Sequence, residues 1–395
     1  MEERQGPLAG IKVIEFSGIG PAPMCAMLLA DLGAEVIAVD RPQQSGLGIE
    51  RPREFDLCRR SRSSISIDLK AAEGVACALD LICRADAVIE GFRPGVMERL
   101  GLGPEVCCER NPRLVYGRVT GWGQDGPLAR SAGHDLNYIA VSGALAQFGR
   151  AGEPPMIPLN LVGDFGGGAM FLAFGIACAL LEAARSGKGQ VVDASVVEGT
   201  ATLLTGIYGL FAAGLHARPR GENLLDGGAP HYNVYRCADG EWITIAAIEA
   251  KFRKDLLVRI GFDPANFPDV EDRRNWPYAR RLLQERFAQR PQSQWCELLL
   301  GTDACFAPVL GLSDAAAFAH NSERKTLIEI DGIVQPAPAP RFSRTPAGVP
   351  TAPEEIGSST VAVLKKWGIP VEEIALLADR GIIPPPHSSI QSSQF

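Results

Sequence analysis

The chain has 395 residues, 46% of them hydrophobic, and a formal net charge of −7. This modest negative charge gives no basic surface of the kind that binds nucleic acid. The length exceeds the ~250–300 residues at which single cores stop growing, so we expect two domains.

Ten cysteines occur without regular spacing. This pattern indicates free thiols in a reducing cytoplasm and implies no metal site. The N-terminus is polar up to the first expected strand, which predicts no signal peptide and a cytoplasmic location. The apolar run 199–215 is shorter than the ~20 residues of a membrane span and contains Gly206, Gly209 and Gly214, so we expect no membrane segment.

Strands and helices alternate through the first half of the chain. Strands are expected at 11–16, 34–40, 64–70, 87–90, 114–119 and 190–194, and helices at 24–32, 72–83 and 165–181. This alternation is typical of the α/β class and predicts a doubly wound, Rossmann-like parallel sheet in a large domain over residues 1–200.

The first strand–helix unit imitates a nicotinamide-binding fingerprint. Gly18 and Gly20 are followed by Asp40 about twenty residues after the second glycine. Pro23 replaces the third glycine, which removes the close helix packing that the fingerprint needs. Nicotinamide binding is therefore disfavoured.

Arginines crowd the segment after the second strand and could attract a phosphorylated ligand: Arg41, Arg51, Arg53, Arg59, Arg60 and Arg62. Arg93 and Arg99 follow the fourth expected strand. A guanidinium suits phosphate because its planar fork donates two hydrogen bonds at once. A solvated charged face is the alternative for each arginine taken singly.

The second half of the chain predicts a smaller α+β domain. A linker helix is expected at 201–225 and the small domain at 226–330, with a hairpin of strands 232–237 and 242–246 and helices at 251–260 and 276–287. Residues 331–395 would return through a proline-rich linker to helices 361–367 and 371–380, which rejoin the large domain. Disorder is expected from residue 384.

His134 and Asp164 are the candidate acid/base residues. Asp164 is expected to be the N-cap of the helix 165–181, whose glycines 166–168 would let another molecule come close. A helix cap and a buried histidine are the alternatives for the two residues taken singly. Together they could exchange a proton with one substrate atom near neutral pH.

Ordered motifs over roughly residues 7–345 resemble the α-methylacyl-CoA racemase branch of the family III CoA-transferase superfamily. They lie at 93–96, 100–103, 120–124, 133–138, 158–168, 187–194, 225–230, 247–249 and 340–343. The resemblance implies an enzyme of lipid metabolism that inverts the 2-methyl centre of acyl-CoA thioesters. Coenzyme A is then part of the substrate, and no separate cofactor is expected.

The resemblance also implies roles for four residues. His134 would act on the (2S)-thioester and Asp164 on the (2R)-thioester, with Glu249 orienting His134 as a carboxylate does in hydrolytic triads. A backbone N–H near Asp135 would stabilise the enolate oxygen.

The resemblance implies that Arg41, Arg60, Arg93 and Arg99, which stand at family positions, hold coenzyme A. We add Arg62, which neighbours Arg60 in the sequence. Arg41 is expected at the adenine. Ile19, Met170 and Phe171 could line an apolar floor for the acyl chain or simply pack in the core.

Three other functions remain open. In a CoA-transferase of the same superfamily, Asp164 would be a nucleophile that forms an acyl anhydride; His134 argues against this, since a transferase needs no second base. A CoA-binding regulatory module and a nicotinamide dehydrogenase are the others.

The resemblance finally implies an interlocked homodimer. Two long connections, 195–230 and 331–345, would let each chain thread around the other. Glu249 of one chain would then complete the site of its partner.

Overall fold

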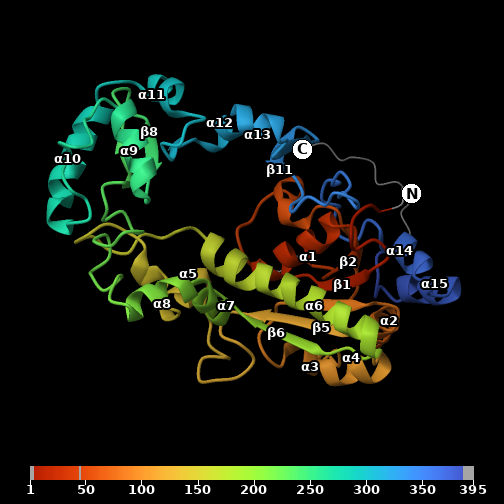
Figure 1. Cartoon of the computed structure of the whole chain (residues 1–395). Coiled ribbons are helices and arrows are strands. Elements are labelled where there is room, and N and C mark those ends of the chain that lie inside the picture. Colours follow the sequence, from red (N-terminus) through yellow and green to blue (C-terminus); the bar gives the residue numbers. More distant parts are fainter. Residues whose placement is uncertain (1–3, 44–45, 386–395) are drawn as a thin grey trace. The chain divides into compact units, whose positions relative to one another are not determined.

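The computed structural model describes residues 4–43 and 46–385, and the chain is shown in Figure 1. Contacts divide it into a large unit (Met1–Ser142, Leu159–Leu203 and Lys325–Phe395) and a small unit (Gly143–Pro158 and Leu204–Arg324). Most of the predicted linker helix 201–225 thus groups with the small unit, which includes residues from 204 onward. The tail after residue 385 lies outside the described residues.

The large unit is built on a six-stranded parallel sheet in the order β3-β2-β1-β4-β5-β6. The strands are β1 Lys12–Phe16, β2 Glu35–Asp40, β3 Ser63–Ser66, β4 Ala87–Glu90, β5 Val115–Thr120 and β6 Val191–Ser195. All six occur where the sequence predicts a strand, although β3 is shorter. The predicted doubly wound fold is confirmed.

The strand order reverses between β1 and β4, which pair directly with Ile14 opposite Val88. In open sheets of this kind, ligands bind beyond the carboxyl ends of the strands at such a reversal. The loops after Phe16 and Glu90 are therefore the places to look for a site.

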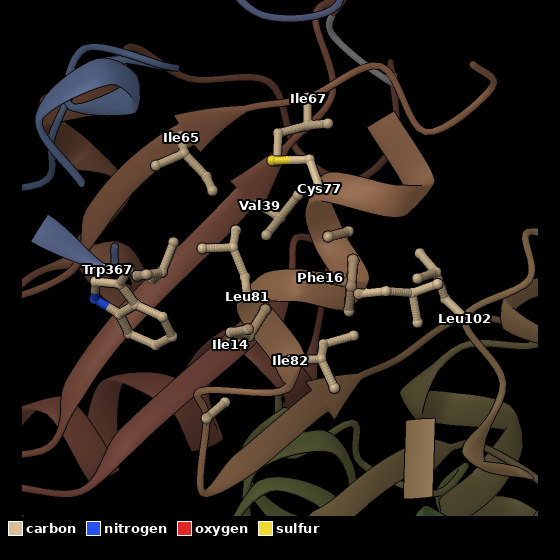
Figure 2. Packing of buried hydrophobic residues seen from close by; sticks show 14 of the residues in the cluster. Ile14, Phe16, Val39, Ile65, Ile67, Cys77, Leu81, Ile82, Leu102 and Trp367 are labelled. Atoms are coloured by element: carbon tan, nitrogen blue, oxygen red, sulfur yellow. The ribbon is translucent and has the colours of Figure 1, made fainter. Parts of the chain in front are cut away.

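Helices cover both faces of the sheet. Figure 2 shows one face, where Ile14, Phe16 and Val39 pack against Leu81 and Trp367. The covering helices there are α2 Ala72–Ile82, α4 Pro104–Arg110, α14 Thr360–Lys366 and α15 Val371–Asp379. The other face is covered by α1 Pro21–Asp31 and α6 Met170–Ser186.

The helix around Asp164 differs from the sequence prediction. A π-helix, Leu161–Ala169, runs directly into α6, so Asp164 lies inside the first turn and is not an N-cap. Glycines allow the close packing of this turn, because a Cβ on Gly167 would collide with α7 (Val196–Leu203) and one on Gly168 would lie 2.8 Å from Pro21 Cβ. π-helical turns occur frequently at functional sites.

The π-helix and α6 together, Leu161–Ser186, are long and apolar enough to cross a membrane by length and composition. The core helix of a soluble protein passes the same test. Leu172 and Ile176 of this helix are buried and pack against Gly117 of β5. The helix is therefore part of the core of the large unit.

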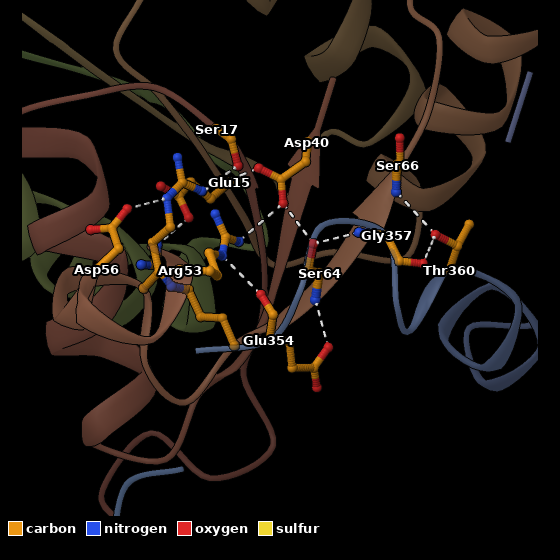
Figure 3. A network of polar contacts seen from close by, with 12 residues as sticks. Glu15, Ser17, Asp40, Arg53, Asp56, Ser64, Ser66, Glu354, Gly357 and Thr360 are labelled. Carbon is orange, nitrogen blue, oxygen red and sulfur yellow. Dashed lines mark hydrogen bonds and ion pairs between the residues drawn. The ribbon is translucent and has the colours of Figure 1, made fainter. Parts of the chain in front are cut away.

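The carboxyl ends of β2 and β3 are joined by the polar network of Figure 3. The Asp40 carboxylate accepts hydrogen bonds from the Ser64 hydroxyl at 2.6 Å and from Arg59 at 3.2 Å, and it lies 3.4 Å from Arg53. Its oxygens are thus engaged by the protein itself. The ribose-binding part of a nicotinamide fingerprint has no free carboxylate here.

The remaining elements of the large unit are short. They are α3 Val96–Arg99, α5 Asp135–Val141, two 3-10 turns at Arg53–Phe55 and Leu57–Arg59, and an antiparallel pair, β10 Leu327–Ile330 and β11 Ile333–Pro336.

The small unit contains an antiparallel sheet of β7 Tyr232–Arg236, β8 Trp242–Ala246 and β9 Phe306–Pro308. Its main helices are α9 Ala250–Arg259, α10 Trp276–Phe287 and α11 Gln292–Leu299, and shorter elements are η3 Leu145–Gln147, α8 Thr205–Ala212, η5 Arg273–Asn275, α12 Leu312–Ala317 and α13 Ala319–Glu323. Ile243, Phe287 and Trp295 are at most 1% exposed in its separate core. The predicted hairpin and the two predicted helices are present.

Candidate active site

His134 lies at the N-cap of α5, with extended backbone angles, and its side chain is exposed. Its backbone N–H is held by the Asn137 side chain at 3.0 Å. The buried histidine considered from the sequence is therefore wrong, because the imidazole is open to solvent and to a ligand.

Tyr138 fixes the turn that precedes His134. Its hydroxyl donates a hydrogen bond to the carbonyl of Gly133, and Trp122 packs edge-on against its ring with centroids 4.8 Å apart. A Cβ on Gly121 or Gly133 would collide with that ring. Burial, with a smaller contribution from the Asp164 charge, raises the pKa of Tyr138 to about 12, so the hydroxyl stays a donor.

Asp164 lies half-buried in the π-helical turn, facing the amino end of α1. Gly20, the N-cap of α1, has a φ of 71°, and a Cβ on it would lie 3.2 Å from Asp164 Oδ2. The absent side chain at Gly20 leaves the room that the carboxyl occupies.

Burial raises the pKa of Asp164 to about 7, and the negative charge of Asp135 adds to the shift, whereas a hydrogen bond from Asn160 opposes it. A carboxyl with this pKa is present in both protonation states at neutral pH. It can therefore both remove and return a proton, as a general acid/base must.

Asp135 is buried, and its carboxylate reaches back to the π-helix. Oδ1 accepts the backbone N–H of Asp164 at 2.7 Å, and the carboxylate also accepts the N–H of Gly163. The loop carrying His134 and the turn carrying Asp164 are thus brought together within the large unit.

Glu249 belongs to the small unit, where it is the N-cap of α9. Its side chain is exposed and makes no cap hydrogen bond. The carboxylate is consequently not used as a helix cap, and its pairing with His134 stays a prediction.

The five arginines predicted to hold coenzyme A fall into two groups. Arg60 is buried in an ion pair with Asp31 at 2.5 Å and also donates to Gln335, and Arg62 is buried in an ion pair with Glu15. Both guanidinium groups are engaged by the protein's own carboxylates. Their contact with coenzyme A stays a prediction.

Arg41, Arg93 and Arg99 are exposed. The Arg41 guanidinium lies over the Phe92 ring, 5.5 Å from its centroid. Arg93 and Arg99 line a pocket of about 270 Å³ together with Arg130. Among the described residues, no carboxylate forms an ion pair with any of these three.

Sequence reasoning missed Arg130. Its position four residues before His134, in the same loop, was the available signal. The candidate acyl floor is partly open to solvent, with Ile19 36% and Met170 52% exposed and Phe171 half-buried. Over residues 4–43 and 46–385, no group of three or more His, Cys, Asp or Glu side chains could hold a metal ion.

Comparisons with known proteins confirm the resemblance found in the sequence. The model of CoA-transferase family III matches residues 8–360. The chain is 43% identical to the alpha-methylacyl-CoA racemases of Mus musculus, over 380 residues, and Homo sapiens, over 381 residues, covering 95% of this chain and 97% of each relative.

More distant relatives include the alpha subunit of a succinyl-CoA–L-malate CoA-transferase of Chloroflexus aurantiacus, 31% identical over 96% of this chain and 94% of that one. Among solved structures, a CAIB/BAIF family protein from Brucella suis superposes with a TM-score of 0.79 at 25% identity. The superposition covers 92% of this chain and 100% of that one.

Proposed function

The chain belongs to CoA-transferase family III, and on this premise we propose that it is an α-methylacyl-CoA racemase, an isomerase that inverts the 2-methyl centre of acyl-CoA thioesters. The observation that carries the proposal is the pair of His134 and Asp164 in one unit, with the pKa of Asp164 at about 7. The 43% identity to two racemases over nearly the whole chain supports it.

Inversion requires the removal of a weakly acidic proton from one face of carbon 2 and the return of a proton to the other face. The two groups that do this must differ in protonation state. Neutral His134 facing protonated Asp164 would serve the (2S)-thioester. Imidazolium facing carboxylate, with the same total number of protons, would serve the (2R)-thioester.

The enolate oxygen formed between the two proton transfers needs a hydrogen-bond donor. The first N–H groups of an α-helix have no acceptor within the helix, and Asp135 is the first residue of α5. We assign its backbone N–H to the enolate oxygen, where a fixed amide dipole stabilises charge with little reorganisation.

The phosphates of coenzyme A suit the pocket of Arg93, Arg99 and Arg130. Three guanidinium groups without carboxylate partners among the described residues can each donate two hydrogen bonds to an anionic group. Arg41 remains the candidate for the adenine.

A homodimer is part of the proposal, with Glu249 from the partner chain orienting His134. Large apolar side chains of α6 are exposed, with Phe174 71% and Leu181 56% open to solvent. Large apolar side chains that lie exposed in one helix are typical of a face that another chain covers. We also propose a cytoplasmic enzyme that works without nucleic acid, membrane, metal or nicotinamide.

The CoA-transferase alternative is less well supported. Asp164 fits a nucleophile equally well, but the second base His134 has no task in acyl transfer. The transferase relative is also less similar, at 31% identity against 43%.

The test is incubation of a (2R)- or (2S)-2-methylacyl-CoA with the enzyme in D₂O, without added metal or acceptor acid. We expect deuterium at carbon 2 by NMR and loss of configuration by chiral analysis. In His134→Ala both should be abolished for the (2S)-thioester, from which His134 removes the proton. Transfer of the acyl-bound CoA to a free carboxylic acid, with no deuterium at carbon 2, would establish the transferase.

The shared site is tested with two inactive variants, His134→Ala and Glu249→Ala. Interlocked chains should regain activity when the variants are unfolded and refolded together, but not when the folded proteins are mixed. A fully active monomer in sedimentation would contradict the dimer.

A further inference from the structure

The side chain of Asp135 connects the two candidate bases. Asp135 directly follows His134 at the start of α5, and its Oδ1 accepts the backbone N–H of Asp164 at 2.7 Å. A second hydrogen bond comes from the N–H of Gly163. The Asp135 carboxylate thus links the start of α5, next to His134, to the backbone of Asp164.

We propose that the Asp135 carboxylate is a positioning residue, which holds the π-helical turn of Asp164 against the first turn of α5 and places a second negative charge beside Asp164. This role of the side chain goes beyond the backbone N–H assigned above, and it rests on the proposed racemase function.

The packing around Asp135 leaves no room for a side chain at residue 163. A Cβ on Gly163 would collide with Asp135 Oδ1 and would lie 2.7 Å from a side-chain carbon of Ile139, one helical turn further along α5. Asp135 itself is 8% exposed. A buried carboxylate that accepts two backbone N–H groups is held in one orientation, so the separation of the two bases is set by this contact.

Among the described residues, the only charge that raises the pKa of Asp164 is that of Asp135. Tyr138 of α5 is also coupled to Asp164, but with a pKa of about 12 it stays neutral. Gly20 and Pro21 face the π-helix from α1, and Gly199 and Thr200 face it from α7. Asn160 contributes a neutral amide. In the part of the chain that the structure describes, Asp135 is therefore the charged group that disfavours ionisation of Asp164. A protonated His134 would have the opposite effect, because a positive charge favours a carboxylate.

This arrangement predicts a specific change in pH dependence. The pair works with one shared proton, and below its lower apparent pKa both groups are protonated and no base is available. Removal of the Asp135 charge lowers the pKa of Asp164, so the one-proton state is reached at lower pH. The acid limb of kcat/KM should then move to lower pH, equally in both directions, because the equilibrium between the two thioesters does not depend on the enzyme.

The experiment compares Asp135→Asn with Asp135→Ala. An asparagine keeps an acceptor oxygen for the N–H of Asp164 but carries no charge. We expect it to shift the acid limb down by about one pH unit while keeping most of the wild-type kcat. Alanine removes both acceptor and charge, and we expect kcat to fall about 100-fold as the two bases lose their alignment.

A matched control is Asp193→Asn, on β6. Its carboxylate also accepts a backbone N–H, from Gln124 at 3.3 Å, and burial likewise raises its pKa. Asp193 has no contact with either base, so we expect an unchanged acid limb.

A second readout needs no turnover. The ¹³C resonance of the Asp164 carboxyl, assigned by its loss in Asp164→Asn, should titrate near pH 7 in the wild type and at lower pH in Asp135→Asn. An unchanged titration, or equal losses in the Asn and Ala variants without a shift, would overturn the inference. If the wild-type protein does not racemise the thioester, the proposed function is overturned. The titration of Asp164 can still be measured in that case, so the two failures are distinguishable.

Discussion

Two regions of the large unit differ in whether their charged side chains form ion pairs. Beside β1–β3, Arg60 and Arg62 are each 3% exposed and are paired with Asp31 and Glu15. Beyond β4, three exposed arginines line one pocket without a carboxylate partner among the described residues.

The carboxyls show the same contrast. Asp31 and Glu15 each form an ion pair with an arginine, whereas the charge that acts on the Asp164 carboxyl is that of another carboxylate, Asp135. Where opposite charges are matched, they stabilise the fold. Where like charges are kept together, the imbalance is available to a ligand or to proton transfer.

The largest expected effect is a loss of stability when the Arg62–Glu15 ion pair of the first region is removed. Replacing Arg62 by Met leaves the Glu15 carboxylate buried without its partner, which should lower the free energy of unfolding by about 3–5 kcal/mol in urea titrations. The double variant Arg62→Met/Glu15→Leu should recover much of the loss. A stable Arg62→Met enzyme with a raised KM would instead make Arg62 a ligand residue, as the sequence predicts.

The second effect concerns the unmatched carboxyls. The pKa of Asp164 in the folded protein, about 7, lies above the ~3.9 of an unfolded aspartate. The wild type therefore loses stability as the pH rises from about 4 through 7, because the unfolded state releases its proton first.

Asp164→Asn escapes this loss. We compare the free energy of unfolding of this variant with that of the wild type at two pH values. The difference, variant minus wild type, should be about 1–3 kcal/mol larger at pH 8 than at pH 4, after discounting for partial exposure. Denaturant unfolding at the two pH values measures the difference. A gap independent of pH would show that Asp164 is ionised normally.

The smallest effect sharpens the comparison between the arginine groups. Arg99→Gln and Arg130→Gln should each raise KM about tenfold, equivalent to ~1.4 kcal/mol, with kcat at saturation unchanged, since binding contacts of this kind are uniform. The melting temperature should not move. Arg113→Gln, an exposed arginine in the loop before β5, is the control, and an equal effect there would remove the phosphate assignment.

The sequence predicted the parallel sheet well because the pattern of strands and helices is local information. Strands such as 34–40 are apolar runs buried on both faces, and their alternation with helices leaves few topologies. The candidate bases were found by motif and by chemistry, since histidine and a buried carboxyl suit proton transfer. Neither inference depends on a distant contact.

The π-helix was beyond sequence reasoning. An i→i+5 turn and an α-helical turn have the same apolar composition, and Asp164 before a glycine run is equally typical of an N-cap. Only the packing of Gly167 and Gly168 against α7 and α1 distinguishes the two.

The amino-acid sequence by itself determined the doubly wound sheet, the hairpin of the small unit and the residue types of the candidate proton-transfer pair. Tertiary structure decided which arginines are paired with carboxylates, because the partner of Arg62 lies 47 residues away in the sequence and that of Arg60 lies 29 residues away. It also decided the acidity of Asp164, which depends on burial and on a carboxylate 29 residues earlier. Charge is a property of the residue, but its neutralisation depends on which distant residues the fold places beside it.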